Sequence, residues 1–152
     1  MTQESELPSD YSLYVPDRDD GEPFPIDIDD GVQVDLIEKT GMENMRARLW
    51  YFQPGDSVSY HYHDEQEELF YIVKGTGTMI IGEDRERVDI PEGGMIRPST
   101  STPRHLRNDS DEEAIWLIVG APAVMEAQLW TEYEEDGTPS QEGEFQDVSE
   151  FM

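Results

Sequence analysis

Between Val32 and Val119 the chain is a series of short β-patterned segments separated by turn residues. Alternation, as in the segment Ser57-Val-Ser-Tyr-His-Tyr-His63, and runs rich in β-branched and aromatic residues, as in Leu69-Phe-Tyr-Ile-Val73, are typical of strands. Glycine-containing turns separate these segments at close spacing. No helical periodicity of useful length occurs before Pro122. The pattern predicts an all-β sandwich or barrel.

The two ends of the chain lack this pattern. Residues 1–31 are rich in Asp, Glu, Pro and Ser, which predicts a loose acidic N-terminal arm. Residues 32–121 form the expected β domain. In residues 122–152 we expect a short helix over 123–130, with Pro122 at its first position, followed by a loosely held acidic tail. A chain of 152 residues is long enough to bury one core without disulfides, and it contains no cysteine.

The net charge of −26, from 36 acidic and ten basic residues, restricts the partners of this protein. A nucleic-acid duplex or an anionic membrane surface would repel it, so we expect neither as a partner. The acids are scattered along the chain and only two lysines occur, a composition that resembles proteins of halophilic microbes, in which high salt screens the self-repulsion. The first residues show no signal-peptide pattern, and no apolar run is long enough to span a bilayer. A cytoplasmic protein is the expectation.

Two of the three histidines, His61 and His63, lie two residues apart in the alternating segment. In a regular strand they would share one face with Ser59, while Val58 would point to the opposite face. Two imidazoles at this spacing can reach one ion, and a carboxylate from the next strand can complete a set suited to Fe(II), Mn(II), Ni(II) or Zn(II). The alternative is a chance pair of histidines near carboxylates in an acidic protein.

The glycines around this pair extend the pattern to Gly55-x5-His61-x-His63-x4-Glu68-x6-Gly75, which resembles the first sequence motif of the cupin superfamily. The resemblance covers about residues 32–120. It implies a small antiparallel jelly-roll barrel, or double-stranded β-helix, with a site in its mouth. It also selects Glu68 over Glu67 as the third ligand. Since dimers are frequent in the family, it implies a homodimer.

The second cupin motif is matched less well. When the chain is aligned without a gap from Gly93 to Asn108, the position of the family's fourth ligand holds Arg104, and His105 follows one residue late. Leu106 is the sole apolar residue in 104–108, so it should face the core together with Arg104, and His105 should point to the opposite face. A β-bulge could instead bring His105 inward as a metal ligand.

Arg104 leaves three alternatives open. It can clamp the carboxylate or phosphate of a bound substrate beside a metal, it can pair with Glu68 in a barrel that binds no metal, or it can lie on the surface rim. The resemblance implies a divalent ion (Fe, Mn, Ni or Zn), or none, and a small ligand that can be anionic.

Two classes of function remain open. One is a metalloenzyme, such as a dioxygenase or isomerase, in which the metal activates oxygen or polarises the substrate. The other is a non-catalytic domain that binds or senses a small molecule. The chain has no histidine beyond His105 and the candidate ligands, which weighs against the enzyme. The fold does not decide, because one barrel hosts many activities.

Overall fold

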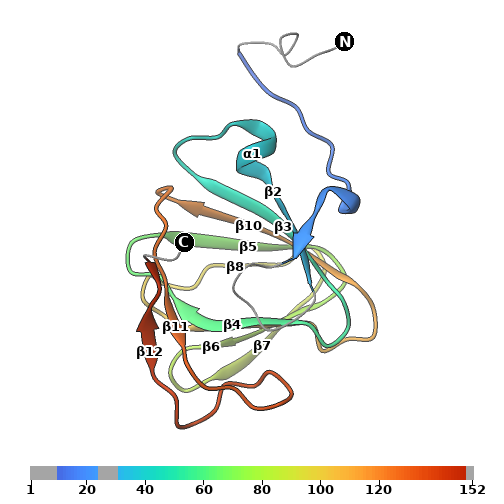
Figure 1. The fold of residues 1–152 in the computed structure, drawn as a ribbon. Coiled ribbons are helices and arrows are strands. Elements are labelled where there is room, and N and C mark those ends of the chain that lie inside the picture. Colours follow the sequence, from blue (N-terminus) through green and yellow to red (C-terminus); the bar gives the residue numbers. More distant parts are fainter. Residues whose placement is uncertain (1–9, 24–30, 150–152) are drawn as a thin grey trace.

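The computed structural model describes residues 10–23 and 31–149, and two six-stranded antiparallel sheets form the body of the molecule (Figure 1). The first sheet has the order β1-β2-β3-β10-β5-β8, and the second has the order β12-β11-β4-β9-β6-β7. The strands are β1 (Glu22–Pro23), β2 (Val32–Asp35), β3 (Arg46–Phe52), β4 (Ser57–Tyr62), β5 (Glu67–Lys74), β6 (Gly77–Ile81), β7 (Glu86–Ile90), β8 (Met95–Ile96), β9 (Arg104–Arg107), β10 (Ala114–Ala121), β11 (Gln128–Trp130) and β12 (Phe145–Asp147). The all-β prediction is confirmed.

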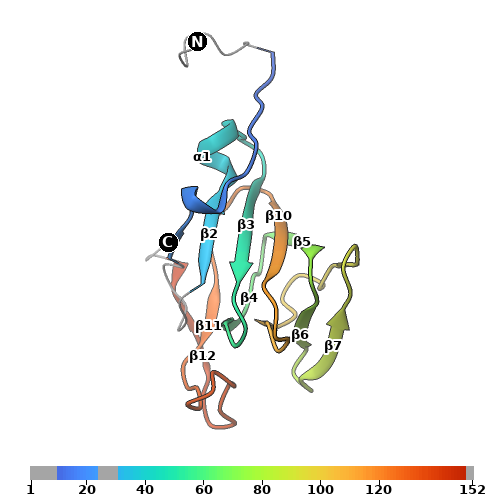
Figure 2. The same cartoon turned by 90° about the vertical axis from the view of Figure 1, so that its right-hand side faces the viewer.

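From β3 to β10 the chain passes repeatedly between the two sheets. Strand β4 belongs to the second sheet and β5 to the first, so two strands adjacent in sequence form opposite walls (Figure 2). Gly55 and Gly75, the glycines that bound this pair in sequence, have φ of 89° and 80°. Residues that carry a side chain rarely adopt this left-handed backbone conformation, which explains why glycine occupies both turns.

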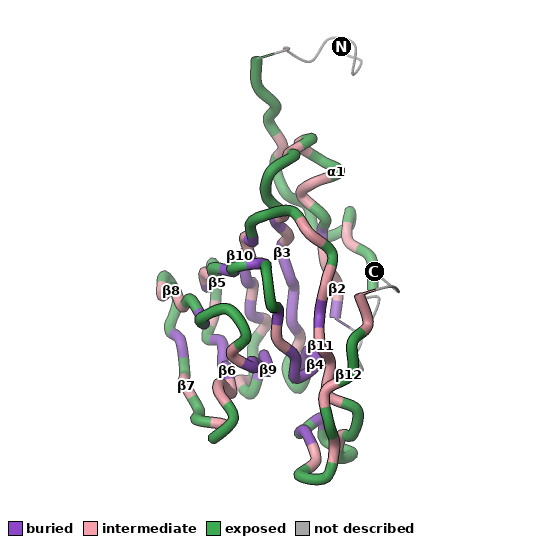
Figure 3. The backbone as a smooth tube through the Cα atoms, turned by 90° about the vertical axis from the view of Figure 1, so that its left-hand side faces the viewer, coloured by how far each residue is buried: buried purple, intermediate pink, exposed green. Residues whose placement is uncertain are grey.

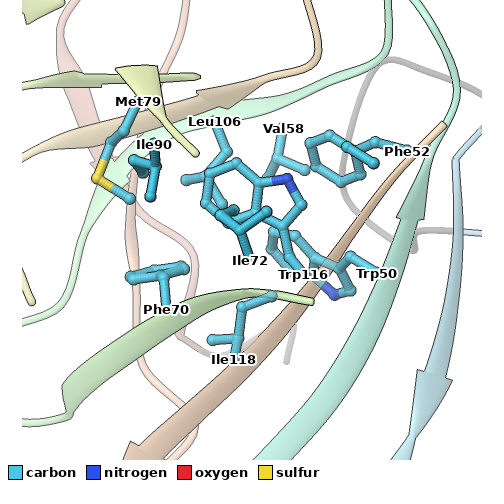
Figure 4. Packing of buried hydrophobic residues seen from close by; sticks show 11 residues of the cluster. Trp50, Phe52, Val58, Phe70, Ile72, Met79, Ile90, Leu106, Trp116 and Ile118 are labelled. Atoms are coloured by element: carbon cyan, nitrogen blue, oxygen red, sulfur yellow. The ribbon is translucent and has the colours of Figure 1, made fainter. Parts of the chain in front are cut away.

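The main core lies between the two sheets (Figure 4). Trp116, Phe52 and Phe70 are almost fully buried there, and the rings of Trp50 and Phe52 stack with centroids 5.7 Å apart. Each large apolar side chain removed from water in this way contributes about 1.5–3 kcal/mol. The remaining buried members of this core are Val58, Ile72, Met79, Ile90, Leu106, Ala114 and Ile118.

A second apolar cluster covers the outer face of the first sheet and involves the N-terminal segment. Tyr14 packs against it, and Glu22–Pro23 pairs with β2, so these parts of the predicted loose arm are held by the sheet. Residues 1–9 and 24–30 of the predicted arm lie outside the described residues. The cluster consists of Val34, Leu49 and Tyr51, with Tyr14, Val32, Leu36, Ile115 and Leu117 at its edge.

A one-turn helix, α1 (Leu36–Thr40), follows β2 and interrupts the β-patterned part of the chain. The Asp35 carboxylate accepts a hydrogen bond from the Ile37 N–H, and Gly41 ends the helix with φ of 76°. This N-cap and glycine C-cap satisfy the ends of the helix and explain why the alternating pattern stops here. A short η-helix (Arg18–Asp20) precedes β1.

The prediction of a short helix over 123–130 is wrong. Residues 123–127 have no regular secondary structure, and β11 follows, which pairs with β4 on one side and with β12 on the other. Trp130 and Phe145 from this hairpin pack on Tyr60, on the outer face of β4, with ring centroids 5.5 and 5.3 Å from it. An isolated eight-residue helix is marginal in water, so sheet pairing and aromatic packing prevail. The tail through Asp147 is therefore part of the sheet.

Buried positions follow the strands of both sheets, whereas the N-terminal end of the described chain is exposed (Figure 3). Within residues 10–23 and 31–149, no helix has the length and apolar character needed to cross a membrane.

Candidate metal centre

His61 on β4, His63 just after it and Glu68 on β5 converge between the two sheets. One potential ligand atom from each lies within 4.8 Å of the others, and all three residues are buried. His63 Nε2 is 3.5 Å from Glu68 Oε1, and the two imidazole rings meet edge to face with centroids 5.1 Å apart. These three residues, called the metal centre below, could hold a metal ion.

Backbone carbonyls fix the orientation of both imidazoles. His61 Nδ1 is 2.7 Å from the Ser59 carbonyl oxygen, and His63 Nδ1 is 2.6 Å from the Glu126 carbonyl oxygen. In each case the Nδ1–H donates, which leaves the Nε2 lone pair available to an ion, as is usual for histidine ligands. Burial, followed by the neighbouring His63 and Arg104, lowers the pKa of His61 well below its ordinary value. His61 is therefore neutral near pH 7, the form that binds metals.

Strand β4 is not regular, which corrects the expected alternation. The pairing of β4 with β9 shifts between Val58 and His61, and Val58 lies in the main core although His61 also faces the interior. The Tyr60 N–H donates to the Tyr133 hydroxyl, 2.9 Å away. This irregularity turns the end of β4 so that His61 faces the interior three residues after Val58.

Arg104, on β9, lies beside the metal centre. It is 0% exposed, and its Nη1 donates to Glu68 Oε1 at 2.9 Å. Its Nη2 is 3.4 Å from the Ser99 carbonyl oxygen, while its Nε is buried without a hydrogen-bond partner. Burial lowers the pKa of this guanidinium, and Glu68 opposes that shift.

His105 points away from the metal centre, as the gapless alignment with Leu106 inward predicts. Its Nδ1 donates to the Val58 carbonyl oxygen at 2.7 Å, and its Nε2 accepts from Arg107 Nη1 at 3.2 Å. Burial and the positive charge of Arg107 lower the pKa of His105 to about 4. Both ring nitrogens are thus occupied by other partners, and His105 is not part of the metal centre.

Two further arginines near the metal centre were missed from the sequence. Arg46 and Arg48 lie on β3, on the same face as Trp50 of the main core. The sheet register aligns Arg46 with Gly120 of β10, and Gly120 with Glu68. The alternation of these arginines with apolar residues along β3 was the signal that could have revealed them.

Glu126 was also missed, because it fell in the expected helix. Its carboxylate accepts hydrogen bonds from the N–H groups of Asp64, Glu65 and Gln66, at 2.9, 3.3 and 3.2 Å, and so caps the turn between β4 and β5. Its carbonyl oxygen holds His63. The segment before β11 therefore positions one of the candidate ligands.

The donor set fits a divalent transition metal. Two imidazole nitrogens with fixed tautomers and one carboxylate are the ligands that Fe(II), Mn(II), Ni(II) and Zn(II) accept. Arg104 binds only Oε1 of Glu68, so the second carboxylate oxygen remains available. The residues present thus fit a metal, although they supply three ligands rather than four.

Comparisons with known proteins agree with this fold. Residues 48–120 match the family model described as the cupin domain. A vicilin from hazelnut, Corylus avellana (Cor a 11.0101), is 30% identical over 95 residues, which is 58% of this chain. The chain spans about a fifth of the length of that curated relative, 21%.

Among solved structures, a cupin-superfamily sugar phosphate isomerase from Silicibacter pomeroyi is similar with a TM-score of 0.60 and 18% identity, covering 94% of this chain and 92% of that one. The polyketide cyclase RemF from Streptomyces resistomycificus is similar with a TM-score of 0.66 and 15% identity, covering 82% of this chain and 89% of that one. A protein with a double-stranded β-helix domain from Klebsiella pneumoniae is similar with a TM-score of 0.64 and 15% identity, covering 80% of this chain and 100% of that one. At these identities the similarity shows the fold alone.

Proposed function

We propose that this chain is a cupin, because residues 48–120 match the family model described as the cupin domain, and that His61, His63 and Glu68 hold a divalent metal ion beside a small anionic molecule. The observation that carries the proposal is the orientation of the imidazoles. Both Nδ1–H groups are bound to backbone carbonyls, so both Nε2 lone pairs are available next to the Glu68 carboxylate. Histidine ligands of metals usually donate their other ring N–H to a carbonyl or carboxylate in this way.

The role of Arg104 follows from its contact with Glu68. It holds one carboxylate oxygen of Glu68 at 2.9 Å inside the protein, a charge-assisted hydrogen bond. Because Arg104 already offsets Glu68, the two positive charges of a divalent ion would be opposed within the site only by the Glu126 carboxylate beside His63. An anionic ligand would offset them, which is why we propose one.

The activity we favour is isomerisation of an anionic substrate. When bound, a divalent ion would supply Lewis-acid polarisation of a substrate oxygen. The chain's own residues would orient the substrate, with Arg104 beside its anionic group and the buried centre limiting access of water. Two of the similar structures, from Silicibacter pomeroyi and Acidithiobacillus ferrooxidans, are described as sugar phosphate isomerases, the second as putative, which supports this choice.

One observation favours a second candidate, a non-catalytic domain that binds a small molecule. Among the described residues close to the metal centre, the groups that could transfer a proton are the candidate ligands themselves, His61, His63 and Glu68. Glu126 is committed to capping the β4–β5 turn. An assay of isomerase activity on sugar phosphates, run beside direct binding measurements, separates the two candidates.

The metal content of protein purified without an affinity tag tests the proposal. We expect close to one divalent ion per chain by elemental analysis, and a sharp loss in His61→Ala, His63→Ala and Glu68→Gln. Glu67→Gln is the matched control, because Glu67 is exposed and pairs with the exposed Arg97. Equal metal content in all four variants would show that these residues do not form the site.

A further inference from the structure

Arg46 and Arg48 bring positive charge toward the metal centre, and the acids that act on them, Glu68 and Asp35, do so without a hydrogen bond. Within the described residues, neither forms an ion pair or a hydrogen bond, and Nε and Nη1 of Arg46 are buried without a partner. The guanidinium of Arg48 lies 5.7 Å from the centroid of the Trp50 ring, a cation–π contact that leaves its N–H edge available. Unpaired guanidinium groups at a partly buried position are costly, so their presence requires a reason.

These side chains lie close to one another and to the candidate ligands. Glu68 interacts electrostatically with Arg46, Arg48 and Arg104, and Arg48 also acts on His61. We call Arg46, Arg48 and Arg104 the arginine group. For each member, burial is the main cause that lowers the pKa, which indicates that the surrounding protein does not fully compensate its charge.

The charge of this region differs from that of the molecule. The whole chain carries −26, yet three of its eight arginines gather beside Glu68, and the further carboxylates that act on them are Asp35 and Glu126. Arg104 is ion-paired with Glu68, whereas no hydrogen-bonded carboxylate holds Arg46 or Arg48 within the described residues. Partial exposure of Arg46 and Arg48 leaves them accessible to a solute.

We propose that the arginine group binds a small molecule that carries a dianionic group, such as a phosphate monoester or a dicarboxylate. The planar guanidinium matches the oxygen geometry of phosphate and carboxylate, and two guanidinium groups without a hydrogen-bonded carboxylate match a dianion rather than a monoanion. A phosphate monoester carries −1.5 to −2 near pH 7. This inference rests on the proposed function in placing the ligand beside the metal centre, whereas the arginine group itself does not require the metal.

Gln66 adds a second feature to the proposed ligand. Its side-chain nitrogen donates to the carbonyl oxygens of Pro122 and Val124, and its Oε1 is buried without a partner. A Cβ atom at position 120 would lie only 2.8 Å from this oxygen, so a glycine there leaves space for the Gln66 side chain. In the sheet register Gly120 lies between Arg46 and Glu68. An orphaned acceptor at this place would take a hydrogen bond from a hydroxyl of the ligand, so the dianion should also carry a hydroxyl group.

Calorimetric titration at pH 7.5 tests the inference, with inorganic phosphate, malonate and the monoanion acetate as probes. We expect phosphate or malonate to bind the protein about tenfold more tightly than acetate, or better, and the tighter of the two identifies the kind of dianion. Arg46→Gln and Arg48→Gln should each weaken that binding about tenfold, since hydrogen bonds between charged groups are the stronger kind. The affinity of Arg46→Lys for the dianion should lie between those of the parent and Arg46→Gln, because lysine keeps the charge but lacks the planar guanidinium.

The matched control is Arg97→Gln, which removes an exposed arginine that pairs with exposed Glu67. A thermal melt separates binding from a structural role. Without a dianion, Arg46→Gln should melt at the same temperature as the parent or higher, since an uncompensated charge has been removed, whereas loss of a structural contact would lower it. Equal affinity for dianions and acetate, or equal weakening by Arg46→Gln and Arg97→Gln, would overturn the inference.

Parallel titrations of metal-loaded and chelator-treated protein separate this inference from the proposed function. Dianion binding that depends on Arg46 in a protein without metal would support the arginine group while the metal proposal fails. A metal-loaded protein that binds no dianion would retain the metal proposal and overturn the arginine group.

Discussion

At the scale of single residues, the contact between Arg104 and Glu68 decides what the metal centre can bind. Both side chains are buried, and the distance of 2.9 Å allows a charge-assisted hydrogen bond. Removing one partner of such a buried pair typically costs about 3–5 kcal/mol, because the other charge is left uncompensated. The arginine therefore holds the Glu68 side chain in place while adding a positive charge near the ion.

Arg104→His should tighten metal binding. The change removes a cation beside the candidate ion and offers an imidazole at the position where the cupin motif carries its fourth ligand. We expect the affinity for Ni(II) or Zn(II), measured by competition with a chelator, to rise about tenfold, an amount that corresponds to 1.4 kcal/mol. His105→Gln is the comparison and should leave the affinity unchanged. If His105→Gln releases the metal while Arg104→His has no effect, our assignment of β9 is wrong.

His105 should make stability depend on pH. Its pKa is about 4 in the folded protein, against an ordinary value of 6.5. The unfolded chain takes up a proton below pH 6.5 and the folded chain only near pH 4, so the free energy of unfolding falls as the pH drops through this window. The full loss from this residue is about 3 kcal/mol. Denaturant unfolding in molar salt should show a shallower decline for His105→Gln. Parallel profiles for both proteins would contradict this.

At the scale of elements, the sequence indicated what depends on local spacing. The alternation in β4, the turn glycines and the β-rich run in β5 are local, and they pointed to His61 and His63, while the resemblance to the cupin motif selected Glu68. The gapless alignment also placed Arg104 inward, because Leu106 is the only apolar residue nearby and the strand period is two. Arg46 and Arg48 were missed because their partners across the sheet, Gly120 and Ile118, lie about 70 residues later in the chain.

What could not be predicted depends on contacts between distant segments. At the irregular part of β4, the Tyr60 N–H donates a hydrogen bond to the hydroxyl of Tyr133, which lies 73 residues later in the chain. The helix expected over 123–130 rested on local propensity, which pairing with β4 overrides. No local signal in either segment indicates that the two meet.

Tyr133→Phe should therefore affect the metal centre from a distance. The change leaves the Tyr60 N–H without its partner, at a cost of about 1–3 kcal/mol in the free energy of unfolding. Because that hydrogen bond supports the turn of β4 before His61, metal affinity should also fall. Chemical denaturation and metal titration measure the two effects. Tyr62→Phe is the control, since the described structure gives its hydroxyl no hydrogen bond, and an equal effect of both changes would count against this role of Tyr133.

At the scale of the whole molecule, charge is distributed unevenly. The 36 acidic residues are spread along the chain, while three arginines face the metal centre. Excess charge of one sign destabilises a compact state through self-repulsion, and salt screens that repulsion. We propose that the protein is adapted to high salt.

Lowering the salt concentration should destabilise the fold. The screening distance grows from about 3 Å at 1 M to about 30 Å at 0.01 M, so the repulsion between carboxylates that molar salt screens will act at low salt. We expect the melting temperature, followed by circular dichroism in KCl, to drop steeply across this range. A melting temperature that stays constant from 1 M to 0.01 M would contradict adaptation to high salt.

A crystal structure of the metal-loaded protein, with anomalous diffraction recorded at the absorption edge of the bound metal, tests the metal centre most directly. We expect one strong anomalous peak per chain, within bonding distance of His61 Nε2, His63 Nε2 and a carboxylate oxygen of Glu68. A peak at His105, or an ordered Arg104–Glu68 pair with no peak in crystals grown with excess metal, would show that His61, His63 and Glu68 do not bind the ion.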